Sequence, residues 1–388
     1  MTDRIGVNLV WMVPGVVGGS EEYAVRTLEA VLDREPADLD FVVFALESFR
    51  AAHPEICARI PVATVGIGGG SRPTRIAAEN SWLAYQARRH GVSVMHHVGG
   101  RSPAVRRAPT LVTVHDLQPL VYPEHFGPVK ARYLRYAIPR SVASARVVIA
   151  PSEYVRGQLI ERYDLPPERV VAVSAGYEVP RLPAVGDPML GDAVADLLGR
   201  AEPYVVYPAV THPHKDHATV LRAVAQVAAS GRPVRLVLTG AAGAADGDVD
   251  QLVAELNLSD RVVRLGRIER SVLDLVISRA EALVFPSRFE GFGIPVLEAM
   301  ALGCPVIAAD ATAVPEVVGG AGILLPPGDV DAWASALIDR LDGRPPREDA
   351  AAAGRNQAAR FARARSGERL EGAYRLALVD PEQRRSAS

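Results

Sequence analysis

Residues 285–309 read Phe-Pro-Ser-Arg-Phe-Glu-Gly-Phe-Gly-Ile-Pro-Val-Leu-Glu-Ala-Met-Ala-Leu-Gly-Cys-Pro-Val-Ile-Ala-Ala. The apolar residues that lead into this stretch are typical of a buried strand. Gly291 and Gly293 then form a loop whose backbone can approach a ligand closely. A proline after this loop and the Gly-Cys-Pro that follows Leu302 suit the start and the end of a helix. The stretch therefore predicts a strand, a loop, a helix and a second strand.

Two carboxylates frame the loop, with seven residues between them. Glu290 precedes it, and we expect Glu298 in the first turn of the helix. A helix start offers free N–H groups and a positive dipole end, which favour an anion such as a diphosphate. Carboxylates beside an anion must accept hydrogen bonds from other donors, and sugar or ribose hydroxyls are suitable. The pattern indicates a sugar nucleotide, although spacing alone also fits a dipole-complementing Glu298 and a solvated Glu290.

The motif Pro-Ser-x-x-Glu-Gly-Phe-Gly-x-Pro-x-x-Glu-Ala-Met-Ala-x-Gly-x-Pro-Val-Ile resembles the retaining glycosyltransferases of family 4. The resemblance implies an α/β protein of the GT-B fold, with two Rossmann-like, doubly wound parallel-sheet domains facing a cleft. It also implies sugar transfer from a nucleotide diphosphate with retention at the anomeric carbon. Glu290 would hold the donor sugar and Glu298 the ribose. The diphosphate would bind the loop residues Gly291, Phe292, Gly293 and Ile294.

The length of 388 residues suggests two domains. Prolines and glycines interrupt the middle of the chain, which indicates a linker there. We predict an N-terminal acceptor-side domain over residues 1–180, a linker over 181–202 and a C-terminal nucleotide-sugar-binding domain over 203–360. In this fold class the last helix, here within 361–388, packs back toward the first domain and ends in a disordered tail.

Strands alternate with helices in the N-terminal half, which favours a doubly wound parallel sheet whose ligands bind beyond the carboxyl ends of strands. The first strand delivers Gly18 and Gly19 there, and another delivers His115. A glycine pair also fits tight packing, but here it resembles the family's Gly-Gly loop, which contacts donor phosphate or acceptor. His115 can be a strand-end cap. In Thr-Val-His-Asp-Leu it resembles the family's histidine that touches the donor sugar, and the role of Asp116 stays open.

The second half opens with a strand followed by Thr-His-Pro-His-Lys-Asp-His at residues 211–217. Three histidines invite a zinc interpretation, but a proline and a loop give them no common helical face, so no metal is expected. Lys215 can instead pair with a diphosphate at the start of a helix. The segment resembles the family's Arg-Lys-Asn, with His214 in place of the arginine. The resemblance also places Gly240, Arg267 and Ile268 against the nucleotide.

Charge and apolar content limit which partners and which cellular location the sequence predicts. Residues 72–146 hold twelve Lys or Arg and only three acidic residues. This basic region fits either solvated helix faces or peripheral contact with an anionic membrane or lipid phosphate. No nucleic-acid-binding module is recognisable. The sequence shows no signal peptide and no apolar run of membrane-spanning length, and Cys57 and Cys304 suit buried thiols, so a cytoplasmic protein is expected.

The sequence therefore predicts a metal-independent glycosyltransferase without a bound cofactor. GDP-mannose is the favoured donor, because the overall pattern resembles bacterial mannosyltransferases, and UDP-sugars stay open. The acceptor is expected to be a glycolipid, a polysaccharide or a natural-product intermediate. Two alternatives remain: a nucleotide-sugar epimerase of the same fold, and a non-catalytic sugar-nucleotide-binding protein.

Overall fold

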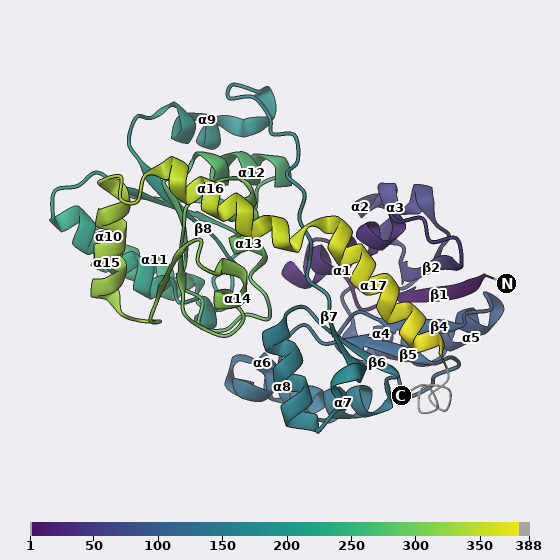
Figure 1. Ribbon diagram of the computed structural model, residues 1–388. Coiled ribbons are helices and arrows are strands. Elements are labelled where there is room, and N and C mark those ends of the chain that lie inside the picture. The colour runs from purple at the N-terminus through teal and green to yellow at the C-terminus, as the bar shows by residue number, and fades with distance from the viewer. Residues whose placement is uncertain (1, 380–388) are drawn as a thin grey trace. The chain divides into compact units, whose positions relative to one another are not determined.

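Two parallel sheets organise the chain, one in each of two units (Figure 1). The computed structural model describes residues 2–379. Within them, unit 1 comprises residues 2–176 and 363–379, and unit 2 comprises residues 177–362. The predicted disordered tail lies outside the described residues. The segment 181–202, expected as a linker, falls within unit 2 and contains a helix that packs against a neighbouring helix of that unit.

The sheet of unit 1 has seven parallel strands in the order β3-β2-β1-β4-β5-β6-β7. The chain leaves β1 toward one edge and later returns to β4 on its other side, so the strand order reverses between β1 and β4. Ligands of doubly wound sheets bind outside the strand carboxyl ends at such a point. Strand β7 was not anticipated, since three residues give too short a pattern. The strands are β1 (Asp3–Asn8), β2 (Leu39–Leu46), β3 (Val62–Val65), β4 (Val94–His97), β5 (Thr110–Thr113), β6 (Val147–Ala150) and β7 (Val170–Ala172).

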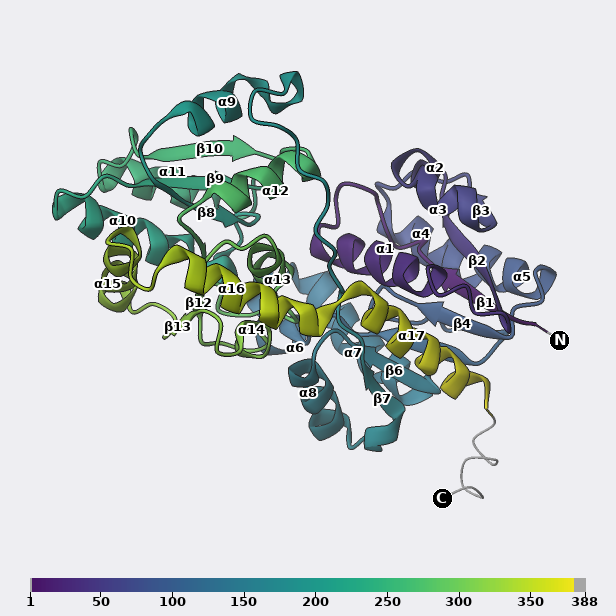
Figure 2. The ribbon, with the colours of Figure 1, turned by 45° about the horizontal axis from the view of Figure 1, so that its top comes forward.

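The helices of unit 1 bury apolar faces on this sheet. Leu83 of α5 and Ala78 of α4 join a core with Phe44, and Val142 of α7 packs over Val112 in a second core. The final helix α17 lies beside α1 in both views (Figures 1 and 2). The helices are α1 (Gly19–Leu32), α2 (Ser48–Ala52), α3 (Pro54–Arg59), α4 (Arg72–Asn80), α5 (Trp82–Arg89), α6 (Gln118–Val121), α7 (Pro128–Ser144), α8 (Glu153–Tyr163) and α17 (Arg363–Leu378).

The sheet of unit 2 has six parallel strands in the order β10-β9-β8-β11-β12-β13. Its order reverses between β8 and β11, which are the strands that lead into the Lys215 segment and the Glu290 loop. The sequence pattern thus predicted the two strands that flank the reversal. The strands are β8 (Tyr204–Pro208), β9 (Arg235–Thr239), β10 (Val262–Gly266), β11 (Ala282–Phe285), β12 (Val306–Ala309) and β13 (Ile323–Leu325).

Eight α-helices accompany this sheet among the described residues of unit 2. The helix α13 follows the glycine loop, begins at Ile294 with Pro295 in its first turn, and is followed by Gly303 at φ +74°. No described helix is both long enough and apolar enough to cross a membrane. The helices are α9 (Gly191–Gly199), α10 (His217–Ala229), α11 (Asp246–Glu255), α12 (Arg270–Arg279), α13 (Ile294–Ala301), α14 (Val314–Val318), α15 (Val330–Leu341) and α16 (Arg347–Ala358).

Candidate active site

An ion pair joins the two loops at the reversal of the unit 2 sheet. Lys215 Nζ donates to Glu290 Oε1 over 2.5 Å. The side chains keep only 18% and 14% of their surface exposed, so water screens the pair weakly. The sequence assigned the lysine to a diphosphate and the glutamate to a sugar. Their contact places both groups at one point beyond the strand ends.

The backbone around Lys215 is tightly held. Tyr207, at the end of β8, donates its hydroxyl to the Lys215 carbonyl at 2.6 Å. The ammonium lies 5.6 Å from the centre of the Phe285 ring, a cation–π distance. The next residue, Asp216, has a left-handed φ of +49° and accepts from Arg288 at 2.8 Å. These contacts limit where the ammonium can point.

The Glu290 loop is shaped by a glycine and a threonine. Glu290 donates its backbone N–H to Thr312 Oγ1 at 2.9 Å. Gly293 has φ +108°, a conformation that side chains disfavour, and it caps α13. The turn directs the start of α13, beginning with Ile294, toward the same strand edge, where its first amides can meet an anion. Phe292 is buried, and its ring centre lies 5.5 Å from that of Phe361.

Glu298 lies deeper than expected. It is the fifth residue of α13, beyond the first turn, because the helix begins at Ile294. It keeps 2% exposure, and Arg270 pairs with it at 2.6 Å. Arg270 also pairs with Asp274 at 2.9 Å and lies 5.7 Å from the centre of the Tyr177 ring. Burial raises the pKa of Asp274, and the guanidinium opposes that shift.

The remaining predicted residues of unit 2 lie on the adjacent strand ends. The His214 carbonyl accepts from the Arg288 N–H at 2.8 Å, and its ring stacks on His212 with centres 5.8 Å apart. Gly240 donates to the Gly266 carbonyl at 2.8 Å, which brings the end of β9 beside the turn that holds Arg267. Ile268 follows in that turn and is partly exposed. The ends of β8, β9, β10 and β11 thus share one edge of the sheet.

Three predicted residues lie at the carboxyl ends of the strands of unit 1: His115, Gly18 and Gly19. Gly18 caps α1 at φ +68°, and Gly19 is the first residue of that helix. The imidazole Nε2 of His115 lies 2.7 Å from the Val98 carbonyl, so Nε2 carries the proton and Nδ1 is an acceptor. Tyr23 meets the ring edge-on with centres 5.1 Å apart. Burial lowers the pKa of His115 to about 4, which keeps it neutral at pH 7.

Two family models divide the chain in the same way as the sheets. Residues 17–181 match Glycosyltransferase Family 4, and residues 196–357 match Glycosyl transferases group 1. O-antigen chain mannosyltransferase B of Escherichia coli is 31% identical over 69% of this chain and 70% of its own length. The chain belongs to glycosyltransferase family 4.

Two further similarities agree with this family. O-antigen chain mannosyltransferase RfbU of Salmonella typhimurium is 25% identical over 82% of this glycosyltransferase and 86% of its own length. The Anabaena HepE crystal structure in complex with UDP and glucose superposes with a TM-score of 0.72 at 21% identity, over 96% of this chain and 99% of that one. Together with the two parallel sheets, that superposition establishes the GT-B fold.

Sequence reasoning missed three residues of this glycosyltransferase site. Arg270 holds Glu298 and is itself paired with Asp274, and Thr312 holds the backbone of Glu290. Arginine and aspartate four residues apart are common on exposed helices. No local pattern shows that this pair meets a carboxylate on another helix.

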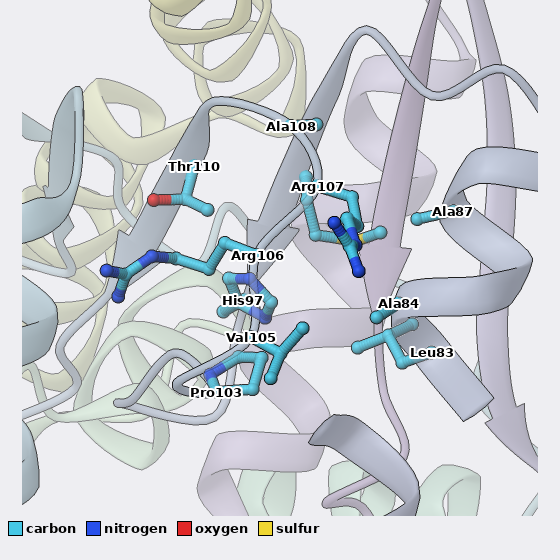
Figure 3. Close-up of a pocket in the computed structure, with 11 residues that line it drawn as sticks. Leu83, Ala84, Ala87, His97, Pro103, Val105, Arg106, Arg107, Ala108 and Thr110 are labelled. Atoms are coloured by element: carbon cyan, nitrogen blue, oxygen red, sulfur yellow. The ribbon is translucent and has the colours of Figure 1, made fainter. Parts of the chain in front are cut away.

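Of two pockets in the described part of the chain, one lies away from these contacts and the other adjoins His212 and Asp216. The first is a narrow hollow in unit 1 between α5 and residues 103–108, where Figure 3 shows His97 between Arg106 and Val105. The other, of about 390 Å³, lies between α10 and α11 and is lined by His212, His217 and Asp248 among others. No group of acidic, histidine and cysteine side chains among residues 2–379 is arranged to hold a metal ion.

Proposed function

We propose that this glycosyltransferase moves a sugar from a nucleotide diphosphate to an acceptor hydroxyl with retention at the anomeric carbon. The observation that carries the proposal is the Lys215–Glu290 pair at the reversal of the unit 2 sheet. A cation and a carboxylate held together there suit a ligand that bears both an anion and hydroxyl groups.

The Lys215 ammonium can donate to Glu290 and to a diphosphate at the same time. It has three N–H donors, one of which goes to Glu290, so the others can reach diphosphate oxygens. In the proposed reaction the bond between the anomeric carbon and the diphosphate oxygen breaks. The acceptor oxygen bonds to the same face of that carbon, and its proton goes to the departing diphosphate. Lys215 and the first amides of α13 stabilise the charge that develops there.

Each remaining site residue has a proposed contact. Glu290 Oε2 accepts from hydroxyls of the donor sugar. Glu298 accepts from the ribose through one oxygen, while Arg270 holds the other. Neutral His115 contacts the donor sugar, and Gly240 and the Arg267 turn lie against the base. Two alternatives, an epimerase and a non-catalytic binding protein, would leave the acceptor unglycosylated.

The relatives and the charge of the chain support a proposal for the donor and the acceptor. Two relatives are mannosyltransferases by name, which supports GDP-mannose as the donor. We propose a glycolipid, polysaccharide or natural-product acceptor and a cytoplasmic enzyme whose basic region, residues 72–146, can contact a membrane surface. No metal is required in the proposed step, because Lys215 and backbone amides supply the positive charge.

A donor-hydrolysis panel tests the proposal. The purified protein is incubated with UDP-, GDP-, ADP- and dTDP-sugars, with and without a chelator, and released nucleoside diphosphate is measured. Release from one donor, unaffected by the chelator, is the expected result. Adding that donor with candidate acceptors should then give a glycoside with the donor's anomeric configuration. Neither release nor thermal stabilisation with any donor would contradict the proposed function.

A further inference from the structure

Cations without carboxylate partners gather where the strand order of unit 1 reverses. Among the described residues, the partly buried Arg75 and Lys130 and the exposed Arg72 form no ion pair, whereas most partly buried arginines of this chain do. They come from α4 and α7, which pack beside the loops that follow β1 and β4. Partly burying a charge is unfavourable unless something neutralises it.

Arg75 is the most constrained of these cations. Its Nη1 donates to the carbonyl of Trp11, in the loop after β1, at 2.5 Å. Its Nε is buried and has no hydrogen-bond partner. Burial lowers the pKa of Arg75, and the charges of Arg72 and Arg101 lower it further. The guanidinium is therefore fixed by a neutral group and retains unsatisfied donors.

Arg101 brings the loop after β4 to the same place. It pairs at 2.5 Å with Glu79, which is 1% exposed and also accepts from Asn8 at 2.9 Å. The Arg101 guanidinium lies 5.7 Å from the centre of the Tyr133 ring on α7. Because Asn8 ends β1, this network ties Arg101 to the strand at the reversal.

Lys130 supplies the fourth charge from α7. Its ammonium lies 4.5 Å from the centre of the Phe126 ring. Burial lowers the pKa of Lys130, and the charge of Arg72 lowers it further, while Asp116 opposes the shift. Arg72 therefore lies within electrostatic reach of both Arg75 and Lys130.

Four cations against two carboxylates leave this cluster with two excess positive charges: Arg72, Arg75, Arg101 and Lys130 oppose Glu79 and Asp116. A phosphate monoester carries about −1.5 to −2 at neutral pH, which matches the excess. A single carboxylate would leave a positive charge uncompensated. Arginine also presents paired donors that fit phosphate oxygens.

We propose that the sugar acceptor carries a phosphate or diphosphate group, which Arg75, Arg101 and Lys130 bind at the strand edge of unit 1. The proposal rests on the proposed function, since it names the acceptor of that transferase. The same phosphate chemistry can come from a soluble sugar phosphate or from a lipid phosphate, and the experiment separates these sources.

Calorimetric titration of the full chain with glycerol 1-phosphate, and with glycerol as the neutral control, tests the site. A saturating nucleoside diphosphate, chosen from the donor panel, fills the donor site. A parallel titration uses Lys215→Ala protein without nucleotide. Arg75→Gln and Lys130→Gln are expected to weaken phosphate binding roughly tenfold or more, the scale of a charge-assisted hydrogen bond. Arg162→Gln, an exposed arginine on α8, removes the same charge and should leave binding unchanged.

Vesicles of phosphatidylcholine with and without phosphatidic acid form the lipid arm. Loss of vesicle binding in Arg75→Gln but not in Arg162→Gln supports a lipid phosphate in the same site. Equal binding of glycerol 1-phosphate and glycerol, or equal losses in all three variants, would overturn the proposal. Because Lys130 is partly exposed, Lys130→Gln should fold normally even if Arg75→Gln does not. If one donor is hydrolysed but glycerol 1-phosphate does not bind, the acceptor site is rejected and the proposed function stands. If no donor is hydrolysed or stabilises the protein, the proposed function itself is contradicted.

Discussion

Lys215 Nζ and Glu290 Oε1 lie 2.5 Å apart, although 75 positions separate the two residues in the chain. They follow β8 and β11, the two strands between which the order of the unit 2 sheet reverses. Each therefore sets the position of the other. A variant at one residue should alter the charge that the other presents to a donor.

Replacing Lys215 by alanine removes the side-chain cation proposed to stabilise the leaving diphosphate. Turnover should fall about 10²- to 10³-fold, the usual effect of losing one electrostatic donor in an active site. The measurement is kcat for donor hydrolysis and, once an acceptor is known, for transfer. Arg222→Ala removes an exposed cation from α10, the helix that follows Lys215, and should keep the parent rate. A near-parent rate in Lys215→Ala would remove this residue from the mechanism.

Variants of Glu290 and Glu298 should change different kinetic constants. Glu290→Gln keeps the shape but loses the charge beside the sugar, so kcat should fall while KM for the donor changes little. Glu298→Gln should mainly raise KM and weaken nucleoside diphosphate binding. Steady-state kinetics and calorimetry with the preferred nucleotide distinguish these effects. The reverse pattern would show that the two assignments are exchanged.

Arg270 should contribute to both stability and nucleotide choice. Arg270→Met leaves Glu298 and Asp274 buried with no cation between them. The expected loss is roughly 3 kcal/mol of unfolding free energy, at the low end for a broken buried pair because the guanidinium is 34% exposed. If Arg270 also orients Glu298 toward the ribose, the variant should discriminate less between ribo- and 2′-deoxyribonucleoside diphosphates.

Arg279→Met is the matched control for that variant, because Arg279 is exposed at the other end of α12. It should retain both the unfolding free energy and the ribose preference. Arg270→Lys should recover part of the stability. Parent-like ribose discrimination in a folded Arg270→Met protein would show that the arginine serves stability alone.

The sequence predicted the alternating strands and helices and both site loops because these depend on local patterns. The apolar run before Pro286 and the glycines after Glu290 were sufficient for the strand and the loop. The start of α13 was predicted too, but the placement of Glu298 in its first turn was wrong, because the helix begins at Ile294 and Glu298 is its fifth residue. Contacts between distant elements, such as Thr312 with Glu290, leave no pattern in a single sequence.

The acid stability of the fold should depend on buried neutral histidines. Burial lowers the pKa of His96 to about 3, where it contacts Tyr374 and Thr113. The unfolded histidine has a pKa of about 6.5, so the unfolded state takes up the proton first as pH falls. The stabilisation of the folded state by neutral His96 is complete above about pH 6.5 and is lost progressively toward pH 3. At pH 5 the loss from His96 alone should be about 2 kcal/mol. The buried His97 and His217 shift in the same direction.

Chemical denaturation of the parent and of His96→Gln between pH 7 and pH 5 measures this effect. The variant should be less stable at pH 7, but its unfolding free energy should fall less steeply as the pH drops. The difference in slope should correspond to close to one fewer proton taken up on unfolding. Carboxyl groups are common to both proteins, so their titration cancels in the comparison. Parallel pH profiles would show that His96 does not control the acid response.

A methyl group at Gly240 should displace the end of β8. It would lie 2.6 Å from the Ala209 carbonyl oxygen, and φ at this glycine is +124°. Gly240→Ala should therefore lower the melting temperature and, because Ala209 leads into the Lys215 segment, lower donor turnover as well. Gly231→Ala is the control: φ there is +81°, and no atom lies within 4 Å of the added methyl group. That control should lose only about 1–2 kcal/mol from left-handed backbone strain and keep its turnover. Equal turnover in both variants would mean that the backbone contact between β8 and β9 does not position Lys215.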